Sequence, residues 1–465
     1  MKLSGKEKAA YGLGAVGKDM VYMLSASYVL YYYQDILGVS AAVMGIILLV
    51  ARIFDAFNDP IMGVVVAKTK TKWGKFRPWL LIGTVTNAVM LYLLFAAPPS
   101  LSAKGLVAYA AVFYILWGVT YTMMDIPYWS MVPAFTDSGK ERESLSALAR
   151  SCAGVGSALI SVAAIISVKA IGSAIEGADA GAALIERTGF KWLSLIVAIL
   201  FIVFTLITCI CIKEKSSVDM ETASVKDMFR ALIQNDQAMT MVITIVLVNT
   251  AVYITNNLVI YFFKYDIANT SWQNDYTLFT TFGGAMQIFA MMLFFPILRK
   301  FFDTIKIFYL SVGSAVVGYL ILLVMALSGT KNIYILFIPA FFIMAAVGVL
   351  NVIVTIFLAN TVDYGEWKNH RRDESVIFSM QTFVVKLASG VAALAASLCL
   401  SIFHIGGAST DEIVTEVVKM SSESVFGLRM TMTIIPIVVL IIALIIFKKK
   451  YTLTDEKLKE IGGQI

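Results

Sequence analysis

Apolar stretches long enough to cross a bilayer recur along almost the whole chain. A transmembrane helix needs about 20 predominantly apolar residues, and about twelve segments reach that length. Charged residues make up only 15% of the sequence, whereas an ordinary soluble domain has roughly 25%. We therefore predict an all-α polytopic membrane protein with about 12 transmembrane helices in two six-helix halves. The predicted spans are residues 9–33, 40–67, 78–98, 105–133, 145–169, 190–212, 235–263, 276–298, 305–328, 333–358, 376–403 and 425–447.

Lysine and arginine are concentrated in alternate loops and at both ends of the chain. The poorer set of loops holds only Lys104, Lys169, Arg187, Lys191, Lys264, Lys331, Lys419 and Arg429. Because basic loops stay in the cytoplasm, both termini are predicted to be cytoplasmic, in a multi-pass protein of the cell (inner) membrane. The net charge of +6 is then a signal of topology. No nucleic-acid partner is expected, since that would need basic residues gathered on one folded face.

The first span contains Lys18 and Asp19 and lacks a small-residue cleavage site, so we expect it to remain as a span. One long polar stretch interrupts the apolar pattern near the middle of the chain. The predicted organisation is a first six-helix half at 1–212, a cytoplasmic middle loop at 213–234, a second half at 235–447 and a cytoplasmic tail at 448–465. Within the middle loop, residues 225–232 are predicted to form a short amphipathic helix along the membrane surface.

A weak internal repeat supports two halves. Asp137-Ser-Gly139 followed by Glu143-Ser144 recurs as Asp363-Tyr-Gly365 followed by Glu374-Ser375. Parallel repeats of this kind are one plan for secondary transporters, with the substrate site near the midplane.

The second predicted span carries two carboxylates. Asp55 and Asp59 are four residues apart, which places them on one face of a helix, where like charges repel. Charged groups in a membrane helix usually mark an ion or substrate path, and Asn58 adds an amide oxygen suited to a small hard cation. The sequence predicts a site for Na⁺ or H⁺ here. The alternative is that Arg52 neutralises Asp55 as a structural ion pair, which leaves Asp59 unexplained.

In the fourth predicted span, Tyr121, Asp125 and Trp129 repeat at intervals of four and give one face with a carboxylate between two aromatic rings. A carboxylate accepts hydrogen bonds from sugar hydroxyls, and an aromatic plane packs on the apolar face of a pyranose. We predict a sugar-binding face. The alternative for the rings is interfacial anchoring or core packing.

The first span adds Asp19 and, three residues later, Tyr22. Lys18 is expected to point elsewhere, because side chains at i and i+1 do not share a helix face. Arg150, at the start of the apolar part of the fifth span, is predicted to hold Asp19 and Asp125 with its planar fork or to bond sugar hydroxyls directly. Its alternative is a snorkelling residue at the cytoplasmic interface.

Several motifs together resemble the glycoside-pentoside-hexuronide:cation symporters of the major facilitator superfamily. They are YGLGAVGKD at 11–19, ARIFDAFNDPIMG at 51–63, WGKFRPW at 73–79, YTMMDIPYW at 121–129 and VDYGEW at 362–367. The resemblance runs from residue 11 to about 386 and is densest in the first half. It implies a cation site at Asp55, Asn58, Asp59 and Thr122, and sugar contacts for Asp19, Asp125, Trp129 and Arg150.

In the second half, the resemblance ties Lys386 to the cation site, where it would balance the acids, and places Gln381 and Thr382 in the cavity wall. The alternative for Lys386 is an ion pair within its own half. The chain departs from the family's pattern at Asn351 and Ala26, which puts the identity of the sugar in doubt.

The predicted function is a secondary active symporter that imports a glycoside, oligosaccharide or monosaccharide with Na⁺ or H⁺ by alternating access, with no other cofactor. The alternative is a facilitator-fold transporter of an anionic sugar derivative or an amphipathic lipid. No enzyme is expected, since the chain has neither a GxSxG nor an HExxH motif.

Overall fold

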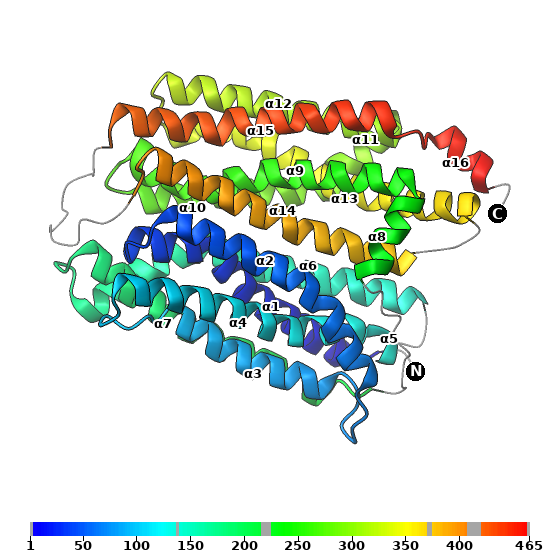
Figure 1. Cartoon of the computed structure of the whole chain (residues 1–465), viewed down its shortest axis with the longest axis horizontal. Helices are drawn as coiled ribbons and strands as arrows, with labels where there is room; N and C mark the ends of the chain where they lie inside the picture. Colours follow the sequence, from blue (N-terminus) through cyan, green and yellow to red (C-terminus); the bar gives the residue numbers. More distant parts are fainter. Residues whose placement is uncertain (1–2, 136–138, 215–224, 370–373, 407–419, 463–465) are drawn as a thin grey trace. The chain divides into compact units, whose positions relative to one another are not determined.

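The computed structural model describes residues 3–135, 139–214, 225–369, 374–406 and 420–462 (Figure 1). These residues fall into two compact units. Residues 3–214 belong to unit 1, and residues 225–405 and 420–462 make up unit 2.

Every regular element among the described residues is helical, so the predicted all-α class is confirmed. Unit 1 contains α1 (Gly5–Tyr31), η1 (Tyr32–Ile36), α2 (Ala41–Lys68), α3 (Arg77–Leu94), α4 (Ala103–Ser130), α5 (Val132–Phe135), α6 (Gly139–Glu176) and α7 (Ala182–Cys211). Unit 2 contains α8 (Val225–Gln234), α9 (Asp236–Tyr261), η2 (Phe262–Ile267), α10 (Trp272–Phe289), η3 (Ala290–Phe294), α11 (Phe295–Phe301), α12 (Thr304–Leu327), α13 (Ile333–Asn369), α14 (Glu374–Ile402), α15 (Ser422–Lys450) and α16 (Asp455–Gly462).

Eleven helices in the described part of the chain have the length and hydropathy of membrane spans. The remaining predicted span, 9–33, coincides with α1 and the start of η1. At 27 residues α1 is long enough to cross a bilayer, but Lys18, Asp19 and several tyrosines make it less apolar than the eleven.

In unit 1, α1 packs on α6 and α7, α2 on α4, and α3 on α4 and α7. A reciprocal tyrosine pair fixes α1 against α4. Tyr11 Oη donates to the Tyr128 carbonyl (2.5 Å), Tyr128 Oη donates to the Tyr11 carbonyl (2.6 Å), and the two rings stack with centroids 4.4 Å apart. Both phenols are thereby satisfied away from water, and the α1 segment after Tyr11 is held beside the last turns of α4.

In unit 2, α9 packs on α14 and α15, while α13 packs on α10 and α12. Arg429 on α15 forms a two-pronged ion pair with Asp266 of η2, at 2.6 and 2.8 Å. Such planar, paired hydrogen bonds are among the stronger ones in proteins. They fix the end of the α9–η2 helix against the start of α15.

The link between α2 and α3 is hydrogen-bonded to a carboxylate from the far end of unit 1. Glu214, three residues after α7, accepts hydrogen bonds from the backbone N–H groups of Lys75 (2.6 Å), Phe76 (3.1 Å) and Arg77 (3.0 Å). Arg77 is the first residue of α3, Phe76 is its N-cap and Lys75 precedes it, so the donors lie at the N-terminus of the helix, which favours negative charge. Glu214 therefore caps α3 and fixes α7 to the α2–α3 link.

We expect Gly74→Ala to destabilise the protein by about 1–3 kcal/mol, because residue 74 has φ +109°, a region that is strained for other residues. A methyl group there would also lie 2.3 Å from Glu214 Oε1. The measurement is thermal unfolding of purified protein in detergent. Gly154→Ala is the matched control, since Gly154 lies in α6 with open space around it, and its unfolding temperature should stay within a few degrees. Equal unfolding temperatures for both variants would contradict the proposed cap.

Candidate functional site

The predicted cation residues lie along the interface of α2 and α4. Thr122 Oγ1 donates to Asp59 Oδ1 at 2.9 Å. One turn earlier on both helices, Asp55 faces Gly118, where a methyl group would lie 2.2 Å from Asp55 Oδ1. The glycine is needed for this close approach. The two helices thus run parallel, with the acid pair of α2 matched to residues 118 and 122 of α4.

Asp55 is 4% exposed and pairs with Arg52, whose Nη1 lies 3.4 Å from Asp55 Oδ2. The guanidinium also stands over the rings of Tyr22 (5.6 Å) and Tyr114 (5.8 Å). The ion pair that we considered as an alternative is therefore present. It does not account for Asp59, which is bound instead to the Thr122 hydroxyl.

Asn58 lies between the two acids in the sequence and is half-buried. Its amide nitrogen makes no hydrogen bond to the described part of the chain. No group of three or more His, Cys, Asp or Glu side chains that could hold a metal occurs among the described residues. The ligand set available at this interface is therefore two carboxylates, a hydroxyl and an amide. This is a sparse oxygen set, better suited to a monovalent ion or a proton than to a divalent metal held by several carboxylates.

A second charged cluster lies between α1 and α4, around Lys18. Its ammonium is 2.8 Å from Asp125 Oδ1, 3.4 Å from Asp19 Oδ1 and 3.4 Å from Tyr121 Oη. It also lies over the Trp129 ring at 5.0 Å. The lysine is only 4% exposed. Asp19, Tyr121, Asp125 and Trp129 are thus brought together as predicted, with a lysine at their centre.

The prediction that Lys18 points away from Asp19 is wrong. The rule that i and i+1 side chains do not share a face concerns the direction in which each leaves the backbone, whereas the flexible four-carbon stem of lysine lets its ammonium reach round. The ammonium of Lys18 is buried, and a buried charge without a counter-charge would be strongly unfavourable. The signal in the sequence was the excess of acids over bases in the apolar parts of these two spans.

Of the two roles predicted for Arg150, the structure does not show the first, an ion pair with Asp19 and Asp125, and the second, direct contact with sugar hydroxyls, remains a prediction. The ion pairs with Asp19 and Asp125 are made by Lys18, while Arg150, exposed on α6, places its guanidinium over the Trp129 ring at 5.2 Å. Arg150 therefore borders the cluster through an aromatic contact.

An aromatic wall joins the two clusters. Tyr22 contacts Tyr121 (5.5 Å between centroids) and Trp117 (6.3 Å), and Trp117 stacks on Tyr121 (5.3 Å) and on Tyr114 (5.8 Å). Trp117 was not predicted. Its spacing of three and four from Tyr114 and Tyr121 on one helix was the available signal. A chain of contacts therefore runs from Asp55 through Arg52, Tyr22 and Tyr121 to Lys18 and its two acids.

The predicted residues of the second half belong to unit 2. On α14, Gln381 and Lys386 are half-buried and Thr382 is exposed; Asn351 is exposed on α13. Ala26, in unit 1, is half-buried on α1. The roles assigned to these residues remain predictions.

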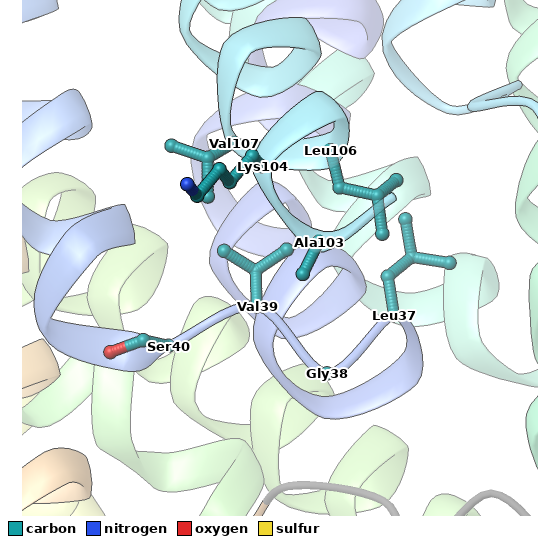
Figure 2. Close-up of a pocket in the computed structure, with 8 residues that line it drawn as sticks. All are labelled: Leu37, Gly38, Val39, Ser40, Ala103, Lys104, Leu106 and Val107. Carbon is teal, nitrogen blue, oxygen red and sulfur yellow. The ribbon is translucent and has the colours of Figure 1, made fainter. Parts of the chain in front are cut away.

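A pocket of about 370 Å³ lies elsewhere in unit 1, between the link from η1 to α2 and the start of α4 (Figure 2). Its lining is mainly apolar, with Ser40 and Lys104 as the polar side chains, and it includes none of the residues above. Its residues are Leu37, Gly38, Val39, Ser40, Ala103, Lys104, Leu106 and Val107. It is therefore separate from the candidate site.

Sequence relatives of this chain are transporters. The chain is 28% identical to an uncharacterized symporter, YjmB, of Bacillus subtilis, over 99% of this chain and 95% of the relative. It is 29% identical to the isoprimeverose transporter of Lactiplantibacillus pentosus over 85% and 80%. It is also 26% identical to the lactose permease of Lactobacillus helveticus over 98% and 71%.

Among solved structures, the fold is similar to a bacterial homologue of the human lysosomal transporter Spinster. The TM-score is 0.69 at 13% identity, over 98% of this chain and 97% of that one. It is also similar to the xylose transporter XylE of Escherichia coli, with a TM-score of 0.62 at 12% identity, over 97% and 98%. These structures support the fold. The family model described as MFS/sugar transport protein matches residues 10–455, and the chain belongs to that family.

Proposed function

We propose that this chain imports a neutral sugar together with a small monovalent cation, Na⁺ or H⁺, by alternating access. The observation that carries the proposal is the continuous contact path in unit 1 between the α2 acid pair and the Lys18 cluster. The names of the relatives, which include a lactose permease and an isoprimeverose transporter, support a sugar as the cargo.

In this proposal Asp55, Asn58, Asp59 and Thr122 hold Na⁺, or Asp55 and Asp59 take a proton. Thr122 can present its oxygen to a cation once its hydrogen bond to Asp59 is released. Arg52 balances the nearer acid while the site holds no cation, and a bound cation lowers the need for that ion pair. No cofactor other than the coupling ion enters the proposal.

The sugar site of the proposal is the Lys18 cluster. Asp19 and Asp125 accept hydrogen bonds from sugar hydroxyls, and Lys18 donates hydrogen bonds to sugar hydroxyl oxygens. The rings of Trp129, Tyr121 and Tyr22 supply aromatic surface for the pyranose face. Arg150 holds the Trp129 ring in place. Two carboxylates against Lys18 and Arg150 give a formally balanced charge, which favours a neutral sugar over the alternative of an anionic sugar derivative. The polar lining likewise disfavours an amphipathic lipid.

Coupling follows from the path between the sites. Cation binding weakens the Arg52–Asp55 ion pair, so that Arg52 moves relative to the Tyr22 ring. The rings of Tyr22 and Tyr121 then take the positions in which they pack against the sugar. Because coupling between two binding equilibria is reciprocal, the sugar must raise cation affinity by the same factor.

Asp59→Asn should abolish the cation's effect on sugar affinity. The amide keeps the hydrogen bond to Thr122 but removes a charge. The stimulation by the coupling cation, on the order of 5–150-fold in coupled systems, should fall to near one, while sugar still binds. Calorimetric titration of sugar into purified protein, with and without Na⁺ and at two pH values, measures this.

Asp303→Asn is the control, since Asp303 is an N-cap residue of α12 and asparagine caps about equally well. It should leave the stimulation unchanged. Full stimulation in Asp59→Asn would exclude the assignment of the cation site.

Lys18→Met should cost roughly 1–3 kcal/mol of stability, because it leaves two half-buried carboxylates without their counter-charge. Adding Asp125→Asn should recover part of that loss. Sugar binding should be lost in both variants, since the ligands of the hydroxyls are changed. Thermal unfolding and calorimetry report the two effects separately.

Lys331→Met removes an exposed lysine from the loop before α13 and should change stability by less than about 0.5 kcal/mol. If Lys18→Met unfolds at the same temperature as this control and still binds sugar, Lys18 is not the counter-ion of the cluster.

A further inference from the structure

The short helix α8 lies directly before a membrane span. Only Asn235 separates it from α9, and that residue has an extended backbone (φ −121°, ψ 93°). Its Oδ1 accepts from Ala238 N at 2.9 Å and its Nδ2 donates to the Thr361 carbonyl of α13 at 2.7 Å. In Figure 1, α8 runs across the direction of α9 and α14. Because α9 has the length and hydropathy of a membrane span, this sharp turn would place α8 along the membrane surface.

The side chains of α8 change character around its circumference. Leu232 is 3% exposed, and Phe229 meets Phe383 of α14 edge to face at 6.0 Å. Phe229 nevertheless remains 46% exposed, and Ile233, one turn later, is 77% exposed. The apolar stripe therefore extends beyond the part that the protein covers.

Two basic residues border this exposed stripe. Lys226 and Arg230 are both exposed and lie one turn apart on the side of Phe229 and Ile233 away from Leu232, as the spacing of a helix requires. An apolar stripe edged by basic side chains is the pattern of helices that lie in the interface of a bilayer. The neighbouring end of α15 adds Lys448, Lys449 and Lys450, and Gln237 Nε2 donates to the Lys450 carbonyl at 3.2 Å.

We infer that α8 binds anionic phospholipid in the membrane surface. Phe229 and Ile233 enter the boundary between headgroups and acyl chains, while Lys226 and Arg230 contact headgroup phosphates. Basic side chains at this depth are attracted by the negative surface potential of an anionic leaflet. A soluble protein partner would explain the exposed apolar residues but not their position in the plane of the bilayer. Through Asn235, the docked helix would fix the start of α9 against α13.

The test uses nitroxide labels on the full chain, with its four native cysteines replaced by serine or alanine. A label at position 233 and one at position 234 are compared in nanodiscs of phosphatidylcholine alone and of equal parts phosphatidylcholine and phosphatidylglycerol. Gln234 is exposed on the polar side of α8 and serves as the reference position. We expect the label at 233 to be more accessible to oxygen than to a water-soluble nickel complex, the label at 234 to show the reverse, and phosphatidylglycerol to enlarge the difference.

Lys226→Gln and Arg230→Gln should each lower the ratio of docked to undocked α8 by about fivefold in the anionic nanodiscs, as the contribution of one basic residue near an anionic surface implies. In phosphatidylcholine alone they should have little effect. Lys331→Gln, in the loop before α13, is the control and should change nothing.

Equal accessibility at 233 and 234 in both nanodiscs would overturn the proposal. So would a label at 233 whose depth does not respond to phosphatidylglycerol or to the two charge substitutions, because apolar insertion alone would then explain it. Protection of the label only when soluble protein is added would assign the surface to a protein partner instead.

Discussion

A charge buried in a membrane helix must find its counter-charge within the protein, and the packing of unit 1 follows from that requirement. Lys18 lies between Asp19 and Asp125, which ties α1 to α4, and α4 in turn receives the acid pair of α2. Leaving such a charge unpaired would cost several kcal/mol. These ion pairs and hydrogen bonds join the helices that carry charge. The Tyr11–Tyr128 pair adds a further link between α1 and α4, and Gly118 leaves room for Asp55 against α4.

Much of this arrangement could be predicted from spacing along single helices. The four-residue interval of Asp55 and Asp59 placed them on one face, and that of Tyr121, Asp125 and Trp129 predicted a mixed acidic and aromatic surface. Contacts between helices could not be obtained in this way. The pairing of Lys18 with Asp125 depends on a flexible side chain and on a neighbour more than a hundred residues away. The same is true of Glu214, whose place on α3 depends on tertiary packing.

The resemblance to a family filled part of that gap. It supplied Thr122 as a partner of the acid pair, which the α2 sequence alone does not contain, and the hydrogen bond to Asp59 agrees with it. The resemblance assigned no role to Trp117, which the sequence shows only as one more aromatic residue in the fourth predicted span. The Trp117 ring is stacked between Tyr114, which lies under the Arg52 guanidinium, and Tyr121, whose hydroxyl contacts the Lys18 ammonium. It therefore connects the two charged clusters.

The two clusters differ in the kind of contact that holds their acids, which bears on the proposed transport cycle. In the α2 cluster, Asp55 pairs with Arg52 and Asp59 accepts a hydrogen bond from the Thr122 hydroxyl. A hydroxyl that donates to a carboxylate can instead turn its oxygen to a bound cation, so the contacts of this cluster can be exchanged for cation contacts. The acids of the other cluster are held by the ammonium of Lys18, which is only 4% exposed. A movement of Arg52 would reach that cluster through the rings of Tyr22 and Tyr121, so cation binding can alter the sugar site while the ion pairs of Lys18 stay in place.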